Sequence, residues 1–303
     1  MFTSLALALS AAAQQPAVVR PVSYDPAKTQ VVMLGTGTPI TDPARSGPAL
    51  AIVVHGAAYL VDAGPGIVRR AAAAQRAGVV ALAQPNLKIV FITHLHSDHT
   101  LGLPDLMFSP WVMERAAPLE VYGPAGTAAM TDHLEQAYAE DIRIRTTGAQ
   151  PHTDSGYVVH AHDIDAGAIY RDSNVTVTAF RVEHGGVPGA LGYKFVTRDR
   201  TIVVSGDTRP SDAVVRACGG CDVLVHEVYS AEALAVRSPD WQRYHRAAHT
   251  SGEELGALAA RARPALLILT HGLPWSSTPD EIVREVRRGF GGAVVYANDL
   301  DIY

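Results

Sequence analysis

Short apolar runs separated by turn residues dominate the chain from residue 29 onward. Runs of this length, rich in Val, Ile and Leu and bounded by Gly, Pro, Asp or Ser, are typical of buried β-strands. They predict strands at residues 30–34, 49–55, 58–62, 88–93, 119–122, 175–183, 192–197, 201–205, 223–226, 265–270 and 293–297.

Stretches with the 3.6-residue period of a helix lie between these runs. Ser251 is followed three positions later by Glu254, and Thr278 by Glu281, which is the capping-box pattern of a helix start. Pro279 stands at the first helical position, where proline is favoured. Helices are predicted at residues 66–77, 127–140, 211–217, 252–263 and 279–288. Many strands with helices at irregular intervals indicate an α+β fold of mixed sheets covered by helices.

The chain has 303 residues, of which 48% are hydrophobic, enough for one large core. A single domain is predicted over residues 29–303, preceded by a polar, proline-containing leader at 14–28. The formal net charge is −5 and the sequence pI is about 6.2. This balance provides no general basic field for gripping phosphates, which argues against a nucleic-acid partner.

Residues 1–13 combine an apolar stretch with small residues and are followed by polar Gln14, which predicts a signal peptide cut near Ala13. The mature protein would then be periplasmic or secreted. Because no Lys or Arg precedes the apolar run, an N-terminal helix or a misplaced start codon in a cytoplasmic protein is the alternative. The stretch is too short to span a bilayer, so no membrane span is expected in the mature protein.

The only two cysteines, Cys218 and Cys221, form a C-G-G-C pattern. A zinc knuckle would need a second ligand pair, and none has matching spacing. A local disulfide fits an exported protein, and two free thiols in a loop are the alternative.

A cluster of the form H-x-H-x-D-H directly follows the apolar run that ends at residue 92. Alternate side chains of an extended chain share a face, so His94 and His96 can reach one metal ion. Asp98 and His99 follow on the next turn and can supply oxygen and nitrogen to a second ion. This spacing indicates half of a two-metal centre and hence a metal-dependent hydrolase.

Other predicted strands also end in side chains that bind metals. They are His184, which precedes a glycine pair, Asp207, His226 and His271, while His249 lies just before the capped helix at Ser251.

Residues 141–172 lack a clear period and are interpreted as a hairpin and loops over this site. His152, His160 and His162 are interpreted as surface or hairpin residues, because none follows a strand with partners at ligand spacing.

These motifs together resemble the metallo-β-lactamase superfamily and, within it, the ribonuclease Z branch. The resemblance extends from about residue 30 to the final strand. It is carried by the segments Leu34-Gly-Thr-Gly-Thr-Pro39, Leu60-Val-Asp62-Ala-Gly64, His94 to His99, His184 before Gly192-Tyr, Ser205-Gly-Asp207-Thr, His226-Glu227, His249-Thr-Ser and Leu269-Thr-His271.

The resemblance implies a four-layer αββα sandwich with a dinuclear zinc site at one edge. It implies a first zinc bound by His94, His96 and His184, and Asp207 bridging to the second. The ligands of the second zinc would be Asp98, His99 and His271. The same donors can also hold Mn²⁺ or Fe²⁺.

The resemblance also implies roles around the metals. Asp62 would orient a ligand histidine, and His249, oriented by Glu227, would protonate the leaving group. With Asp98, these two complete the expected catalytic group. His226 is assigned to the surroundings of the site or simply to the core. Two zinc ions sharing a water would lower its pKa from about 15.7 to about 7 and supply a bridging hydroxide.

The preferred substrate is a small anionic ester, either a phosphodiester or an aryl sulfate, as in secreted arylsulfatases that the chain resembles. The alternative is a ribonuclease Z-type tRNA 3′ endonuclease. The absence of a long basic arm and the predicted signal peptide argue against it. Arg45 is expected near the substrate, where it could anchor an anion. A lactonase, a β-lactamase side activity and a non-catalytic binding domain are further alternatives, and a homodimer is possible.

Overall fold

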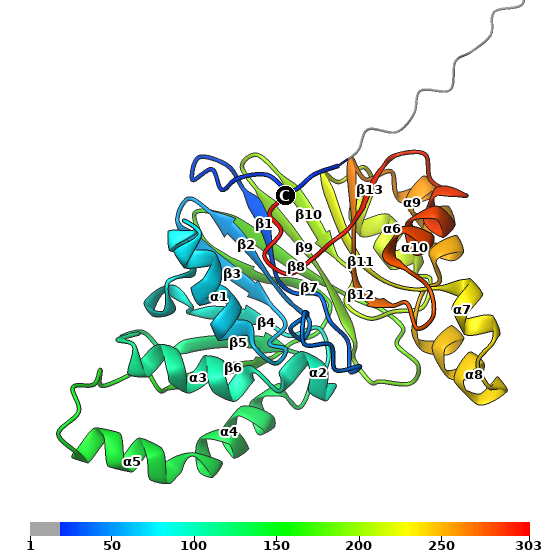
Figure 1. Cartoon of the computed structure of the whole chain (residues 1–303). Coiled ribbons are helices and arrows are strands. Elements are labelled where there is room, and N and C mark those ends of the chain that lie inside the picture. Colours follow the sequence, from blue (N-terminus) through cyan, green and yellow to red (C-terminus); the bar gives the residue numbers. More distant parts are fainter. Residues whose placement is uncertain (1–18) are drawn as a thin grey trace, which may run out of the picture.

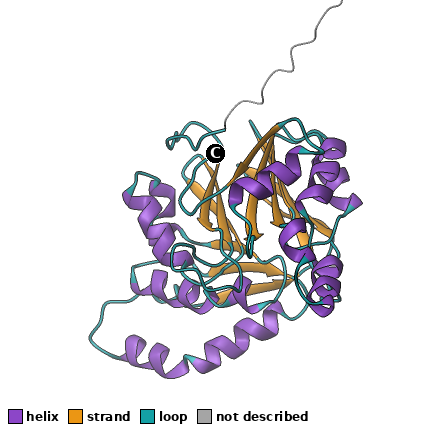
Figure 2. Ribbon diagram, turned by 45° about the vertical axis from the view of Figure 1, so that its right-hand side comes forward, coloured by secondary structure: helices purple, strands orange, loops and turns teal. Residues whose placement is uncertain are grey.

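Two β-sheets lie face to face in this protein, with helices on both outer surfaces (Figures 1 and 2). The structure is a computed structural model, and it describes residues 19–303. The predicted signal peptide at 1–13 and leader residues 14–18 lie outside the described residues. The expected αββα sandwich is confirmed.

The first sheet has the order β1-β2-β3-β4-β5-β6. Its first three strands pair antiparallel and the others parallel. The C-terminal residues continue it, since the backbones of Val31 and Tyr303 bond to each other. The strands are β1 (Gln30–Gly35), β2 (Ala49–Val54), β3 (Ala57–Val61), β4 (Ile89–Phe91), β5 (Leu119–Gly123) and β6 (Val159–Asp163).

The second sheet has the order β13-β12-β11-β10-β9-β8-β7. Strands β10 to β13 pair parallel, and β7 to β10 pair antiparallel. The strands are β7 (Gly167–Arg171), β8 (Val175–Arg181), β9 (Leu191–Thr197), β10 (Thr201–Val204), β11 (Val223–Tyr229), β12 (Leu266–Leu273) and β13 (Ala293–Tyr296).

Both faces of the central strands are buried, which explains their continuous apolar runs. In β1, Val31 and Met33 pack between the two sheets, while Val32 and Leu34 pack outward beneath helices. Apolar area buried on this scale, at about 25 cal/mol per Å², is the main stabilisation of such a sandwich.

Helices cover the outside of each sheet (Figure 2). The first sheet is covered by α1 (Ile67–Arg76) and α3 (Leu103–Val112), and the second by α6 (Asp212–Cys218), α9 (Gly252–Ala262) and α10 (Pro279–Arg287). Both predicted capping boxes are present. The other helices are α2 (Ser97–Thr100), α4 (Thr127–Ala137), α5 (Ala139–Thr147), α7 (Ala231–Ala235), α8 (Pro239–Ala248) and the 3₁₀ turns η1 (Val80–Leu82) and η2 (Gln84–Asn86). Among the described residues, we find no helix with the length and hydropathy needed to cross a membrane.

The predicted hairpin within residues 141–172 is wrong. The stretch begins with α5 and then forms β6 and β7, which pair with different sheets rather than with each other. The chain crosses from one sheet to the other between them. His160 and His162 both contact Glu120 on β5, and His152 is exposed.

Helices α3 and α8 are absent from the sequence prediction. Most of α3 is buried and it contains Pro110, so it shows little of the one-sided apolar period that identifies a helix. Only His245 and Ala248 are buried in α8, which follows Pro239 at a helix start.

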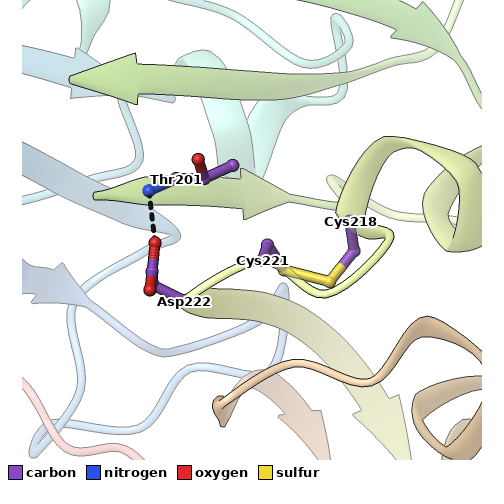
Figure 3. Close-up of a disulfide and its surroundings, with 4 residues drawn as sticks. All are labelled: Thr201, Cys218, Cys221 and Asp222. Atoms are coloured by element: carbon purple, nitrogen blue, oxygen red, sulfur yellow. Dashed lines mark hydrogen bonds between the residues drawn. A yellow bond between two sulfur atoms is a disulfide. The ribbon is translucent and has the colours of Figure 1, made fainter. Parts of the chain in front are cut away.

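Cys218 and Cys221 form a disulfide between the end of α6 and the start of β11 (Figure 3). The structure therefore selects the disulfide over the free thiols. Beside it, the backbone N–H of Thr201 donates to the carboxylate of Asp222 at 2.7 Å, which helps hold β10 next to β11.

Candidate metal centre

Side chains suited to metal binding gather at one edge of the sandwich. Strands β4, β10, β11 and β12 are bonded to parallel neighbours, and the segments at their carboxyl ends supply most of the cluster. In open sheets with parallel strands, ligands bind at this end. The cluster joins His94, His96, His184, Asp98, His99, Asp207 and His271 with His249 and Glu227.

A first group consists of His94, His96 and His184, whose nitrogen atoms lie within 4.8 Å of one another. Nδ1 of His184 donates to the carbonyl of Ala248 at 2.8 Å, so Nε2 of the neutral ring has a lone pair that faces Nδ1 of His96 at 3.2 Å. Nε2 of His94 is buried and has no hydrogen-bond partner. A buried nitrogen without a hydrogen-bond partner destabilises the folded state unless an ion binds it.

A second group consists of Asp98, His99 and His271. His99 Nδ1 bonds to the carboxylate of Asp62 at 2.8 Å, so its Nε2, buried without a partner, faces the group. His271 Nε2 lies 3.1 Å from Asp98 Oδ2. Asp62 therefore lies where the sequence places an orienting acceptor.

Asp207 lies between the two groups. Its Oδ2 is 3.5 Å from His99 Nε2, 3.4 Å from His271 Nε2 and 3.9 Å from His184 Nε2. A carboxylate in this position can contact an ion on either side. It follows Gly206, whose φ of +61° favours glycine and where a Cβ would lie 2.7 Å from the carbonyl oxygen of Leu191.

A β-bulge directs His271 into the site. Leu267 and Leu269 of β12 pack on the helix-covered face, so strict alternation would send His271 to that face too. The register shifts here, because Glu227 and Val228 pair with Thr270 and Gly272. His271 takes a left-handed φ of +44° and turns toward the cluster instead.

Electrostatics suit cation binding. Burial lowers the pKa of each histidine in the first group, so neutral imidazoles are available as ligands. Burial alone would raise the pKa of Asp207, but His271 and His99 hold it well below its usual value. The neutral imidazoles of the first group, the ionised Asp207 and the buried nitrogens without a partner are what a divalent metal requires, so the residues fit such ions.

Replacing Asp62 with asparagine should weaken metal binding by roughly 10–100-fold, because the orienting acceptor of His99 loses its charge. Titration against a chromophoric chelator measures the affinity. Asp199→Asn is the control, because Asp199 is exposed in the turn before β10, at the end of that strand opposite Asp207. Equal affinities in wild type and Asp62→Asn would exclude this role.

His249 and Glu227 form a pair beside the metal groups. His249 Nδ1 is 3.4 Å from Glu227 Oε2, and Glu227 Oε1 accepts from the backbone N–H of Thr250 at 2.9 Å. Burial raises the pKa of Glu227 well above its usual value and lowers that of His249 to about 4. Both shifts favour the neutral form of each group over a buried ion pair, so a proton in this pair is shared by two coupled groups.

Two other candidates lie away from the site. His226 is fully buried, donates to the carbonyl of Glu227 and shares the outer face of β11 with Leu224 and Val228. The expected position of Arg45 near the substrate is wrong. Arg45 is absent from the lining of the cavity that opens over the cluster. Its guanidinium bonds to Thr36, the carbonyl of Ala297 and Asn298, which leaves it bracing a loop rather than facing an anion.

A cavity of about 640 Å³ opens over the cluster, within the usual range for ligand sites. One wall is aromatic and includes Trp241, Tyr244 and His245 of α8 and Trp275 after β12. The sequence analysis missed this wall. The i, i+3, i+4 spacing of the three α8 residues was the available signal. It indicates a shared face only in a helix, and no helix was predicted there.

Residues 58–272 match the family model described as "Beta-lactamase superfamily domain". The chain belongs to the metallo-β-lactamase superfamily. Ribonuclease Z of Mycobacterium marinum is 32% identical over 282 residues, covering 89% of this chain and 96% of that protein. Ribonuclease Z of Mycobacterium bovis is 32% identical over 280 residues with the same coverage. The chain lies in the ribonuclease Z-like branch of the superfamily.

Solved structures agree on the fold. The short form of human tRNase Z has a TM-score of 0.67 and 22% identity, covering 90% of this chain and 98% of that one. The metallo-beta-lactamase fold protein YhfI from Bacillus subtilis has a TM-score of 0.66 and 18% identity, covering 91% and 98%. With its superfamily and its His/Asp clusters, this chain is a metal-dependent hydrolase.

Proposed function

We propose that this metallo-β-lactamase superfamily hydrolase cleaves phosphodiester bonds with two Zn²⁺ ions. The observation that supports this proposal most is the position of Asp207, which lies between two complete groups of metal-binding side chains. His94, His96 and His184 would hold one ion, Asp98, His99 and His271 the other, and Asp207 would contact both. When bound, such a pair activates water and neutralises charge on the phosphoryl oxygens. Mn²⁺ or Fe²⁺ in the same donors is the alternative.

The curated relatives favour RNA as the substrate. Those compared above are named ribonuclease Z and align over nearly their whole length. They support the tRNA 3′ endonuclease alternative over the small anionic esters that the sequence analysis preferred. Aryl sulfate hydrolysis has no support from them.

A small aryl phosphodiester is the second candidate, and the cavity favours it. Arg237 is the one Lys or Arg among the described residues that line it. In the segment between β5 and β6, Arg143 and Arg145 are already paired with Glu140 and Asp141. Neither the lining of the cavity nor this segment therefore offers much unpaired positive charge for a long RNA.

Parallel assays decide between these substrates. Pre-tRNA, bis(p-nitrophenyl) phosphate, an aryl sulfate, a lactone and a cephalosporin are tested on the metal-loaded protein, each with a chelator control. We expect chelator-sensitive cleavage of at least one phosphodiester. Cleavage confined to the sulfate, the lactone or the cephalosporin would refute the proposal.

His249 is proposed to pass the proton that it shares with Glu227 to the leaving oxygen. His249→Ala should keep both metals and slow phosphodiesters with alkoxide leaving groups by roughly 10²–10⁴-fold, the usual contribution of general acid catalysis. Phosphodiesters with a p-nitrophenolate leaving group, which needs little protonation, should slow far less. His133→Ala, at an exposed position of α4, is the control. Equal slowing of both substrate classes would remove His249 from this role.

Export is proposed for localisation. The signal-like residues 1–13 suggest it, and the Cys218–Cys221 disulfide supports it because disulfides persist mainly in oxidising compartments. Expression in the source organism, fractionation and N-terminal sequencing test the proposal. A mature protein that starts before Ser10 would contradict it.

A further inference from the structure

We infer that the aromatic wall of the cavity binds a planar aromatic ring attached to the scissile phosphate, either a nucleobase or an aryl group. The inference rests on the proposed function, because it assumes a phosphodiester at the metal centre. The ring would lie against Trp241, Tyr244 and Trp275, a set that we call the aromatic wall.

The aromatic wall and the metal centre line one continuous cavity. Asp98, Asp207 and His271 line the same space as the aromatic wall. A phosphate held at the metals would therefore place its attached ring in this space.

Two of the three side chains of the aromatic wall lie outside the protein core, while Trp275 packs against Tyr229, Leu234 and Leu273. Trp241 is 48% exposed and Tyr244 is 45% exposed, and neither belongs to a hydrophobic cluster of the described residues. Large aromatic side chains gain most when they are buried, so this exposure indicates a surface that a ligand covers.

Arg237 adds a positive charge at the aromatic wall. Its guanidinium lies 5.7 Å from the ring centroids of both Trp241 and Trp275, a cation–π geometry that holds the two rings. Arg237 takes no part in the ion pairs of the described residues. Its charge therefore complements an anionic ester.

The segment from α7 to α8, which contains Trp241 and Tyr244, is held by buried contacts at both of its ends. The buried carboxylate of Glu285 accepts hydrogen bonds from the Ser230 hydroxyl and from the first backbone N–H groups of α7. At the other end of α8, the carbonyl of Ala248 accepts from the ring of His184. Pre-organisation of this kind lowers the entropic cost of binding a ring.

Tryptophan fluorescence of the metal-loaded protein tests the inference. The chain has three tryptophans, and two of them line the cavity. Adenosine 5′-monophosphate is compared with ribose 5-phosphate, and phenyl phosphate with methyl phosphate. We expect the ring-bearing member of at least one pair to quench fluorescence and bind roughly tenfold more tightly, as stacking on an aromatic side chain allows.

Trp241→Leu should abolish the preference for the ring, whereas Trp111→Phe, in the core beneath the other sheet, should retain it. Preference within the nucleotide pair alone identifies a nucleobase, and preference within both pairs identifies any aryl ring. Equal binding within both pairs, or an unchanged preference in Trp241→Leu, overturns the subsite. If wild type also cleaves bis(p-nitrophenyl) phosphate, only the subsite fails, whereas cleavage of no phosphodiester refutes the proposed function itself.

Discussion

Replacing Asp207 with alanine should remove at least one metal ion and reduce phosphodiester turnover by about a thousandfold or more. Its carboxylate is 4% exposed and lies within 4 Å of histidines from both donor groups. Metal-ion catalysis supplies several kcal/mol of transition-state stabilisation, and each 1.36 kcal/mol changes the rate about tenfold. Elemental analysis and steady-state rates on bis(p-nitrophenyl) phosphate measure the two effects.

Asp154→Ala is the control, because Asp154 is an exposed aspartate between α5 and β6 that takes part in no hydrogen bond or ion pair of the described residues. It should retain metal content and rate. Asp207→Asn keeps the side-chain volume and serves if the alanine variant fails to fold. An Asp207→Asn protein with two ions and a near wild-type rate would disprove the bridging role.

Removing the metal ions should abolish activity and lower the melting temperature by roughly 10 °C. Ions that bind only the folded state at about 1,000 times their dissociation constant stabilise it by about 4 kcal/mol. In a domain of this size, each kcal/mol shifts the melting temperature by roughly 2–4 °C. The structural reason is that buried nitrogens such as Nε2 of His94 and His99 have no other partner. Calorimetry with and without chelator measures the shift.

Adding back zinc should restore both activity and melting temperature. The Asp207→Ala variant should show a smaller chelator shift than wild type, because it starts with less metal. A wild-type melting temperature that chelation leaves unchanged, in protein shown to have bound metal, would contradict the assigned ligands.

Local sequence patterns were sufficient for most of the fold. All predicted strands are present, with ends shifted by a few residues. They could be predicted because strands that are buried on both faces have continuous apolar runs, which are easy to recognise in a sequence. The capping boxes at Ser251 and Thr278 fixed two helix starts, since both partners lie within one turn. Helix α3 was missed because it is buried on most sides and has no clear apolar stripe. Helix α8 was missed although its aromatic residues recur at i, i+3 and i+4, because the segment is polar on its other sides and only His245 and Ala248 are buried.

The sequence by itself determined the donor types and their local spacing. His94, His96, Asp98 and His99 lie within six residues, and strand periodicity with the following turn is enough to predict that they share a site. The ends of other predicted strands added candidates such as His184, Asp207 and His271, and the resemblance to a known family assigned their roles.

Only the tertiary structure decided which distant side chains meet. A bulge turned His271 away from the face that alternation predicts, and β11 directed Glu227 rather than His226 toward the site. Arg45 was engaged by loop residues, and α8 placed aromatic rings beside the metal centre. These outcomes depend on strand pairing and packing between segments far apart in the chain, which the local periodicity of a sequence does not encode.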